Sequence, residues 1–195
     1  MTPTFRRWQP EEAEEAASFL AADEWQFHAL RIPTLEAARE RVASFSDDEV
    51  FWIEVEDAVV GLLRVEDIHA DDCDPTIDIR LLQAWRGRGL GEQVIRWTAE
   101  HVFTTTSQRR LYGQTRVDNH AMRTVFRRCG FVKEAHYRQD WPRPDGTLSD
   151  SVGYTLLRQD WEGGTTTPVV WDDEPAGPQS SEAIGHMISP QGAKR

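Results

Sequence analysis

The sequence contains few cysteines and no long apolar run, and both shortages narrow the class of protein. Cys73 and Cys129 are its two cysteines, too few for a disulfide framework or a zinc site. Its longest wholly apolar stretch, residues 58–63, is far shorter than the roughly 20 residues of a membrane span. The first residues (MTPTFRRWQPEEAEE) lack the apolar segment of a secretory signal. We therefore expect a cytoplasmic protein that does not act at a membrane.

The sequence also has fewer basic than acidic residues. Lys and Arg number 22 against 33 Asp and Glu, so the formal net charge is −11. This balance disfavours a nucleic-acid binder, whose surface should be basic. Residues 80–133, however, hold eleven Lys or Arg and three acids, a local charge of +8 that leaves −19 for the rest. A cationic middle in an acidic chain favours a small polyanionic ligand. The plainer alternative is a compositional preference, since 20 of the 22 basic residues are Arg.

What the sequence does contain is enough for one domain with a core. Apolar residues make up 39% of the 195 residues, with eight Trp and eight Phe. Residues 162–195 differ, because nine of these 34 residues are Gly or Pro, as in low-complexity segments. We expect one domain over residues 1–161 and a flexible C-terminal tail over 162–195, in which residues 169–171 could still pack as a short extended piece.

The order of periodic segments predicts an α+β fold. Helical spacing of apolar residues predicts helices over 10–22, 34–45, 90–103 and 119–129. Alternation predicts strands over 5–8, 51–55, 59–68, 76–82, 109–117, 131–141 and 151–161. The last two strands would be joined across Pro144-Asp145-Gly146, a typical turn sequence. Helices thus occupy the first quarter, and strands interrupted by two further helices form a mixed sheet.

One motif points to chemistry, because a glycine-rich turn joins a strand to a helix. The turn consists of Arg86, Gly87, Arg88, Gly89, Leu90 and Gly91. Glycines allow close backbone approach, and the free N–H groups of a helix start attract anions. No Lys-Ser/Thr follows for a P-loop, and at least three strands come first, unlike in a dinucleotide-binding fold. An ordinary strand-to-helix turn is the bland alternative.

The motif resembles the acyl-CoA-binding sequence Q/R-x-x-G-x-G/A of the GNAT superfamily of N-acetyltransferases, which Arg86, Gly89 and Gly91 satisfy. The later pattern, in which Asn119 opens a helix and residues 129–131 (CGF) start a strand, is similar to the RimJ/RimL-like branch, the ribosomal-protein N-acetyltransferases. The resemblance covers about residues 4–161.

The resemblance implies a GNAT-like mixed, mostly antiparallel sheet of about seven strands flanked by about four helices. It also implies an acetyl-CoA-dependent N-acetyltransferase with no metal cofactor. A primary amine, at a protein N-terminus or on a small molecule, would attack the thioester directly. A homodimer is left open. The rival hypothesis is a CoA-binding module without catalytic competence.

The resemblance also assigns residues to the cofactor. Backbone groups of Leu81, Leu82 and Gln83 would pair with the pantetheine amides, and the N–H groups of residues 86–91 would hold the pyrophosphate. Asn119 and Phe126 would line the pantetheine and thiol side. A compact cationic region matches the phosphates of coenzyme A.

The sequence departs from the family at both usual proton donors. Phe126 stands where many relatives have a Tyr, and Met122 where the RimL-like branch often has a Ser. Water or Tyr137 would have to protonate the departing thiolate instead. These departures motivate the rival binding module.

The proton acceptor and the acceptor-amine pocket are assigned with alternatives left open. Relatives often carry Glu where this chain has Thr76, and Asp78 shares its strand face. Asp78 is therefore the candidate base, unless it pairs with an Arg, in which case Glu66 or water is next. Trp25 and His28 lie in the loop bordering the acceptor pocket, where they bind substrate or close the core.

Overall fold

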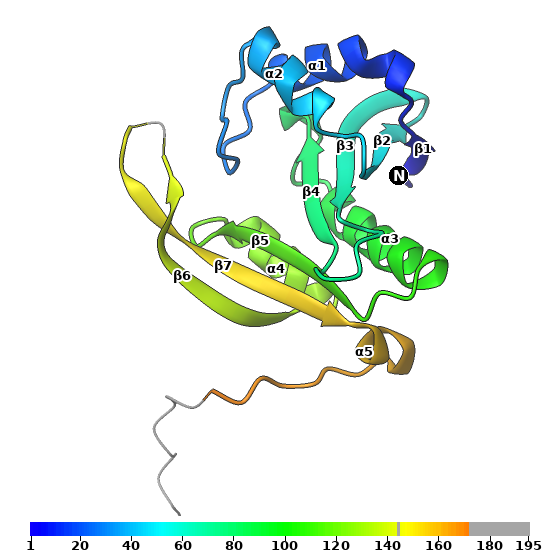
Figure 1. The fold of residues 1–195 in the computed structure, drawn as a ribbon, viewed down its shortest axis with the longest axis vertical. Coiled ribbons are helices and arrows are strands. Elements are labelled where there is room, and N and C mark those ends of the chain that lie inside the picture. Colours follow the sequence, from blue (N-terminus) through cyan, green and yellow to red (C-terminus); the bar gives the residue numbers. More distant parts are fainter. Residues whose placement is uncertain (144, 172–195) are drawn as a thin grey trace, which may run out of the picture.

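The computed structural model describes residues 1–143 and 145–171 of the 195 (Figure 1). Its strands are β1 (Thr4–Arg7), β2 (Glu49–Val55), β3 (Ala58–Glu66), β4 (Thr76–Leu81), β5 (Arg110–Arg116), β6 (Val132–Pro142) and β7 (Leu148–Leu157). Its α-helices are α1 (Ala13–Ala21), α2 (Leu35–Ala43), α3 (Leu90–Thr105), α4 (His120–Arg128) and the short α5 (Arg158–Gly163). Single 3-10 turns, η1 (Pro10–Glu12) and η2 (Gln83–Trp85), precede α1 and α3.

The strands form one seven-stranded sheet in the order β1-β2-β3-β4-β5-β7-β6. Every neighbouring pair is antiparallel except β4 and β5, which run parallel. Four helices of nine or more residues accompany the sheet. The predicted α+β class, with a mixed, mostly antiparallel sheet, is confirmed.

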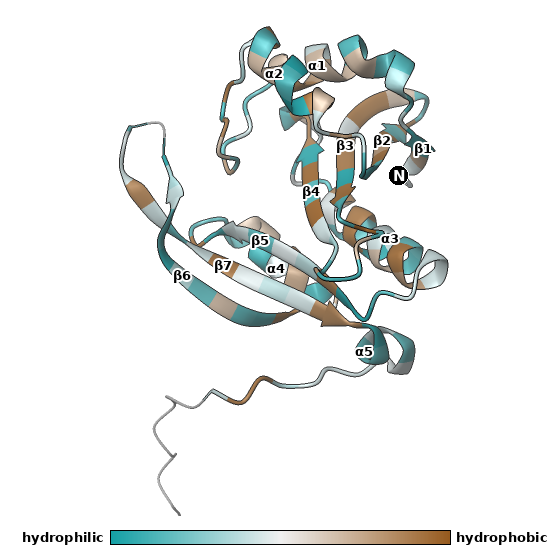
Figure 2. Ribbon diagram, viewed as in Figure 1, coloured by the Kyte–Doolittle hydropathy of each residue, from teal (hydrophilic) through white to brown (hydrophobic). Residues whose placement is uncertain are grey.

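Helices cover both faces of the sheet, and an apolar cluster lies under each layer. One cluster joins α1 and α2 to Val50 and Trp52 of β2. The other joins α3 and α4 to Ile53 of β2 and to residues of β5 and β7. Figure 2 shows the hydrophobic segments concentrated in β2, β3 and one side of α3. Strand β2 is therefore buried on both faces.

Two helices begin where the sequence predicts, for different physical reasons. Asn119 caps α4 by accepting a hydrogen bond from Met122 N at 3.1 Å, as N-cap residues do. Helix α3 begins after Gly89, whose φ of +81° lies in the left-handed region and whose position supplies no side-chain cap. The first N–H groups of α3 therefore have no side-chain partner at the N-cap.

The strand predicted over 151–161 is correct only as far as Leu157. Residues after it form α5, because three backbone carbonyls, of Phe103, Thr106 and Gln108, accept hydrogen bonds from the Arg158 guanidinium. Trp161 packs on Phe103 with ring centroids 5.5 Å apart. These tertiary contacts end the strand, although the sequence continues its alternation.

The sheet opens at its parallel pair. Strands β4 and β5 share one register contact, Thr76 with Tyr112, supported by a 2.8 Å hydrogen bond from Tyr112 N to Pro75 O. Beyond it they part toward their C-terminal ends, as Figure 1 shows. Within the described sheet, the edge of β4 beyond Thr76 that faces β5 has no strand partner. This opening positions the site.

Candidate active site

A cavity of about 310 Å³ lies at the opening between β4 and β5. Its walls come from the loop between α1 and α2, from α2, β3, β4, β5 and α4, and from Trp141 of β6. Apolar residues line part of it, among them Phe27, Leu30, Ile79, Met122 and Phe126. Four charged residues also line it, namely Arg41, Glu66, Asp78 and Arg80.

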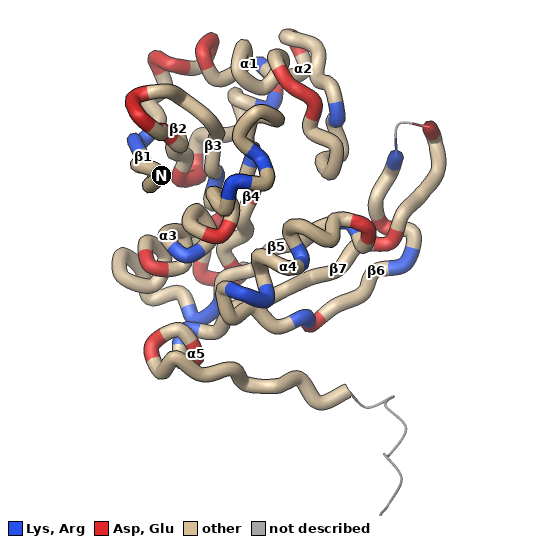
Figure 3. Tube along the Cα trace, turned by 180° about the vertical axis from the view of Figure 1, so that it is seen from behind, with Lys and Arg blue, Asp and Glu red and all other residues tan. Residues whose placement is uncertain are grey.

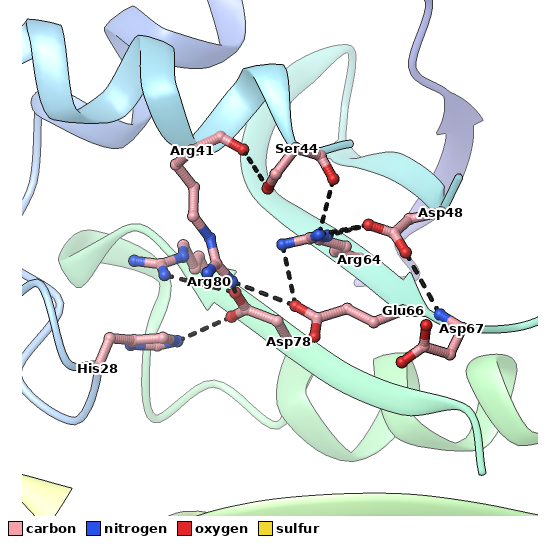
Figure 4. Close-up of polar contacts among 9 residues, drawn as sticks. All are labelled: His28, Arg41, Ser44, Asp48, Arg64, Glu66, Asp67, Asp78 and Arg80. Carbon is pink, nitrogen blue, oxygen red and sulfur yellow. Dashed lines mark hydrogen bonds and ion pairs between the residues drawn. The ribbon is translucent and has the colours of Figure 1, made fainter. Parts of the chain in front are cut away.

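Asp78 is the centre of a polar network in this wall (Figure 4). Its Oδ1 lies 3.0 Å from His28 Nε2, and its Oδ2 accepts hydrogen bonds from Arg41 at 2.6 Å and Arg80 at 3.4 Å. The partners come from a loop, from α2 and from β4 itself. Both carboxylate oxygens of Asp78 are thus engaged.

The network holds Asp78 in its charged form. Burial opposes ionisation, but the Arg80 charge, the His28 hydrogen bond and the Arg41 charge outweigh it and lower the pKa of Asp78 well below its usual range. Asp78 therefore pairs with arginines, as the alternative in the sequence prediction had it. A carboxylate with so low a pKa is a weak proton acceptor, and its role as the base stays a prediction.

Glu66 faces the same cavity from the end of β3. It is directly opposite Thr76 in the β3–β4 register, and paired residues on neighbouring strands project to the same face. Its Oε1 lies 3.3 Å from Arg41 and 3.0 Å from Arg64. Burial raises the pKa of Glu66 above its ordinary value, and Asp78 adds to the rise while Arg64 and Arg41 oppose it.

The two loop residues predicted at the acceptor pocket lie in different places. His28 lines the cavity, and burial lowers the pKa of its imidazole despite the Asp78 hydrogen bond, which keeps the ring neutral near pH 7. Trp25 is 1% exposed and donates from Nε1 to Leu20 O at 2.7 Å. It does not line the cavity; Arg80 and Arg86 each lie over its ring.

The glycine-rich turn is open toward solvent at two positions. Gly87 and Gly89 have φ of +74° and +81°, and a Cβ added at either would meet no atom within 4 Å. A Cβ at Gly91 would instead lie 3.7 Å from Val125 of α4, an ordinary van der Waals contact. The turn therefore exposes bare backbone next to the start of α3.

Arg86 is used to build this turn. Its guanidinium donates to Leu81 O at 2.7 Å and to Glu24 O at 2.8 Å. Asp23 accepts a hydrogen bond from Gln83 N, which ties the same turn to the end of α1. Arg88 stacks on Trp85 instead, 5.1 Å from the ring centroid. Figure 3 shows the basic segments gathered around β4 and along α4, whereas α1 is mainly acidic.

These features fit coenzyme A. An unpaired strand edge can bind pantetheine amides, an uncapped helix N-terminus can bind the pyrophosphate, and two glycines leave room for it. Leu81, Leu82 and Gln83 lie at the end of β4 and the start of the turn. Leu82 N is bound to Val60 O at 2.9 Å, Gln83 N to Asp23 and Leu81 O to Arg86, so their pairing with pantetheine stays a prediction.

Asn119 and Phe126 both line the cavity, at its α4 side. The Asn119 amide also donates to Thr115 Oγ1 at 2.9 Å, so its side chain is held by the fold at both ends. Phe126 is buried and stacks on Tyr154 with centroids 5.3 Å apart. Gly113 on β5 leaves space for that ring, because a Cβ there would lie 2.4 Å from it.

Neither cysteine lines the cavity, so neither offers a thiol nucleophile there. Cys129 is buried, and burial raises the pKa of its thiol to about 11; Cys73 is exposed in the loop before β4. Within residues 1–143 and 145–171, no group of three or more His, Cys, Asp or Glu side chains could hold a metal ion. In that same part of the chain, no helix is long and apolar enough to cross a membrane.

Sequence reasoning missed Arg41 and Trp141 as cavity residues. Arg41 follows the buried Ala38 by three residues on a predicted helix, so helical spacing could have placed it on the face toward the sheet. Trp141 gave no such signal: it reaches the cavity because β6 extends along β7 beyond the body of the sheet, with register shifts before it.

The fold and the open strand pair define an acyl-CoA-transferase architecture, and comparison with known proteins identifies the family. Residues 4–132 match the family described as Acetyltransferase (GNAT) domain. The chain therefore belongs to the GNAT acetyltransferases and is an acetyl-CoA-dependent acetyltransferase, which confirms the superfamily predicted from the glycine motif. No curated protein matches the sequence significantly.

Solved structures show the same fold at low sequence identity. A chimera of spermidine N-acetyltransferase SpeG from Vibrio cholerae and hSSAT is 16% identical, with a TM-score of 0.69, and the match covers 84% of this chain and 99% of that one. SpeG from Vibrio cholerae in complex with CoA and spermine is also 16% identical, with a TM-score of 0.68 over 83% and 98% of the two chains. A probable acetyltransferase is 19% identical, with a TM-score of 0.67 over 82% and 95%.

Proposed function

We propose that this chain transfers an acetyl group from acetyl-CoA to a primary amine, on a protein N-terminus or a small molecule, by direct attack on the thioester. The opening between β4 and β5 carries the proposal, because it joins the glycine turn to a polar cavity. The pantetheine amides pair with the backbone of Leu81 to Gln83, where they replace the internal bonds of Leu81 O with Arg86 and of Gln83 N with Asp23. The pyrophosphate lies on the N–H groups of residues 86–91.

Direct attack fits the absence of an accessible thiol at the cavity. Cys129 is buried with a raised pKa, and an acetyl-enzyme formed on cysteine would need a thiolate. The amine must instead lose a proton and attack the thioester carbon while still bound. His28, held neutral beside Asp78, and the carboxylates of the cavity wall surround the space where that nitrogen would lie.

The charge of the cavity favours an acceptor with a single ammonium group over a polyamine. Two arginines and two carboxylates line it, and Arg64 adds a third cation at Glu66. No unbalanced negative charge is left for a second or third ammonium. The apolar part of the wall would contact the body of the acceptor. The finer similarity to the RimJ/RimL-like branch agrees with such an acceptor, an N-terminal amine.

The test is release of CoA thiol from acetyl-CoA in the presence of single amines. The panel contains spermidine, an aminoglycoside, amino-acid amides and short peptides with free N-termini. We expect turnover above the acceptor-free background with a monoamine, and weaker turnover with spermidine. A preference for spermidine would contradict the charge argument but leave acetyl transfer intact.

CoA binding without turnover across the panel would favour the alternative, a CoA-binding module. Phe126 and Met122, which stand where relatives have proton donors, motivate it. Sedimentation of the same preparation tests whether the chain forms a homodimer, and its presence in the soluble cytoplasmic fraction of its source tests the expected location.

A further inference from the structure

Two carboxylates, those of Glu66 and Asp78, face the cavity, and they differ in how many hydrogen bonds they accept. Asp78 has both oxygens bound, to His28, Arg41 and Arg80. Glu66 Oε1 lies 3.3 Å from Arg41 and 3.0 Å from Arg64. Among the residues that the structure describes, none donates a hydrogen bond to Glu66 Oε2. Figure 4 shows the two carboxylates side by side below Arg41.

From this geometry we propose that Glu66 is the general base of the acetyl transfer and that Asp78 is a positioning residue. The inference rests on the proposed function. An oxygen without a hydrogen-bond donor keeps its lone pairs for an incoming proton, and Glu66 Oε2 is such an oxygen. The Glu66 side chain is also 29% exposed. Asp78 holds His28, Arg41 and Arg80 around the acceptor.

The proton balance of the step is simple. Glu66 Oε2 takes one proton from the acceptor ammonium, directly or through one water. The free amine attacks the thioester carbon, the C–N bond forms and the C–S bond breaks. The second nitrogen proton goes to the departing thiolate, so the products are the amide and CoA thiol, and Glu66 returns its proton to water.

The charged groups around Glu66 agree with this role. Burial raises its pKa, Asp78 and Asp48 add to the rise, and Arg64 and Arg41 counteract it. Arg80 and neutral His28 reach Glu66 only through Asp78. A carboxyl with a raised pKa is a better base at neutral pH than one with a pKa well below its usual range.

The experiment compares pH–rate profiles of kcat/KM for wild type, Glu66→Gln, Glu66→Asp and Asp78→Asn, with the best acceptor of the panel. Glu66→Gln should lower kcat by about 10²–10⁴-fold and abolish the acidic limb, with CoA affinity kept. Glu66→Asp should restore the limb at a reduced rate. Asp78→Asn should retain the limb and move it to lower pH, since removing a negative neighbour lowers the pKa of Glu66.

The matched control is Glu54→Gln on β2, whose carboxylate binds Arg6 at 2.8 Å and does not line the cavity; it should behave as wild type. Arg41→Gln adds a shift of opposite sign, because removing a cation raises the pKa of Glu66 and moves the limb to higher pH. An independent NMR titration of the Glu66 carboxyl in the folded protein should give a pKa above the ordinary value of about 4.3.

Three outcomes would contradict the assignment of Glu66, and a fourth would contradict the proposed function. A Glu66→Gln enzyme with near wild-type turnover and an intact limb overturns the assignment, as does an Asp78→Asn enzyme that alone loses the limb. A Glu66 carboxyl that titrates at or below its ordinary value also overturns it, even if a variant fails to fold. Wild-type enzyme that turns over no acceptor overturns the proposed function itself.

Discussion

Asp78 joins segments of the chain that are far apart in the sequence. It binds His28, 50 residues away, and Arg41, 37 residues away. Arg80, which is largely buried, pairs with the same carboxylate. Removing the charge of Asp78 leaves Arg80 and Arg41 without their shared anion, and breaking a buried ion pair is costly.

We expect Asp78→Asn to lower the free energy of unfolding at pH 7 by an amount near the lower end of about 3–5 kcal/mol, because Asn keeps the shape and part of the hydrogen bonding. The folded pKa of Asp78 is depressed, so its contribution is fully present above the unfolded value of about 3.9 and is lost as the pH falls through the folded pKa. Urea unfolding at a series of pH values should therefore show a difference that is constant near neutrality and shrinks in acid.

The matched control is Asp57→Asn in the β2–β3 turn. Its φ of +65° suits Asn, so stability should stay at the wild-type value. If Asp78→Asn were as stable as wild type at pH 7, the polar network of Figure 4 would make no net contribution to the free energy of unfolding.

Gly89 is exposed immediately before α3, where the pyrophosphate is expected. Gly89→Val should abolish CoA binding in calorimetry, because a branched side chain would occupy open space beside the start of α3. The left-handed φ also costs about 1–2 kcal/mol of stability. Gly146→Val is the control: its φ is also +81° with no atom within 4 Å, but it lies in the β6–β7 turn. We expect both variants to lose the same stability and only Gly89→Val to lose CoA binding. Unchanged CoA affinity in Gly89→Val would show that the turn is not part of the cofactor site.

At the level of elements, the C-terminal helix α5 extends the domain beyond the boundary drawn from the sequence. Asp160 is 3% exposed and accepts hydrogen bonds from Thr165 Oγ1 and from both N and Oγ1 of Thr167. Trp171 lies over Lys133, 5.9 Å from Nζ to the ring centroid. Residues 172–195 of the expected tail lie outside the described part of the chain.

Truncation after Glu162 should therefore lower the melting temperature by several degrees relative to truncation after Trp171. The shorter chain loses the three donors to Asp160, and about 1 kcal/mol corresponds to roughly 2–4 °C in a protein of this size. Scanning calorimetry of the two truncated chains measures the difference. Equal melting temperatures would support the sequence prediction of a flexible tail over residues 162–195.

Local pattern predicted most elements, because alternation and helical spacing are written in consecutive residues. The strand over residues 76–82 and the helix after Gly89 were found within a residue or two. The site was predicted only where a motif is local, as in residues 86–91. Pairing of Asp78 with an Arg was an alternative from the sequence, but the particular partners His28 and Arg41 could not be predicted, because these loop and helix residues reach Asp78 through tertiary packing.

At the scale of the whole molecule, the uneven charge could either attract or repel an anionic ligand such as CoA. The chain carries −11, which repels an anionic ligand, while residues 80–133 carry +8 and include the glycine turn and α4. Which of the two dominates depends on distance, because salt screens exposed charges beyond a Debye length. The ion pairs of Arg86 with Asp23 and of Arg110 with Asp74, whose carboxylates lie outside residues 80–133, reduce the local excess but do not reverse it.

We expect CoA binding to weaken as salt rises from about 0.1 to about 1 M, over which the Debye length falls from about 10 to about 3 Å. At the lower salt the phosphates already sense mainly the basic region, and further salt removes that attraction. If the net charge of the whole chain dominated instead, added salt would screen repulsion and strengthen binding. Isothermal titration at several salt concentrations gives the sign directly. Dephospho-CoA, which lacks the ribose phosphate, is the matched ligand, and its binding should depend less steeply on salt. Binding of CoA that tightens with salt would contradict a role for the basic region, residues 80–133, in attracting the phosphates.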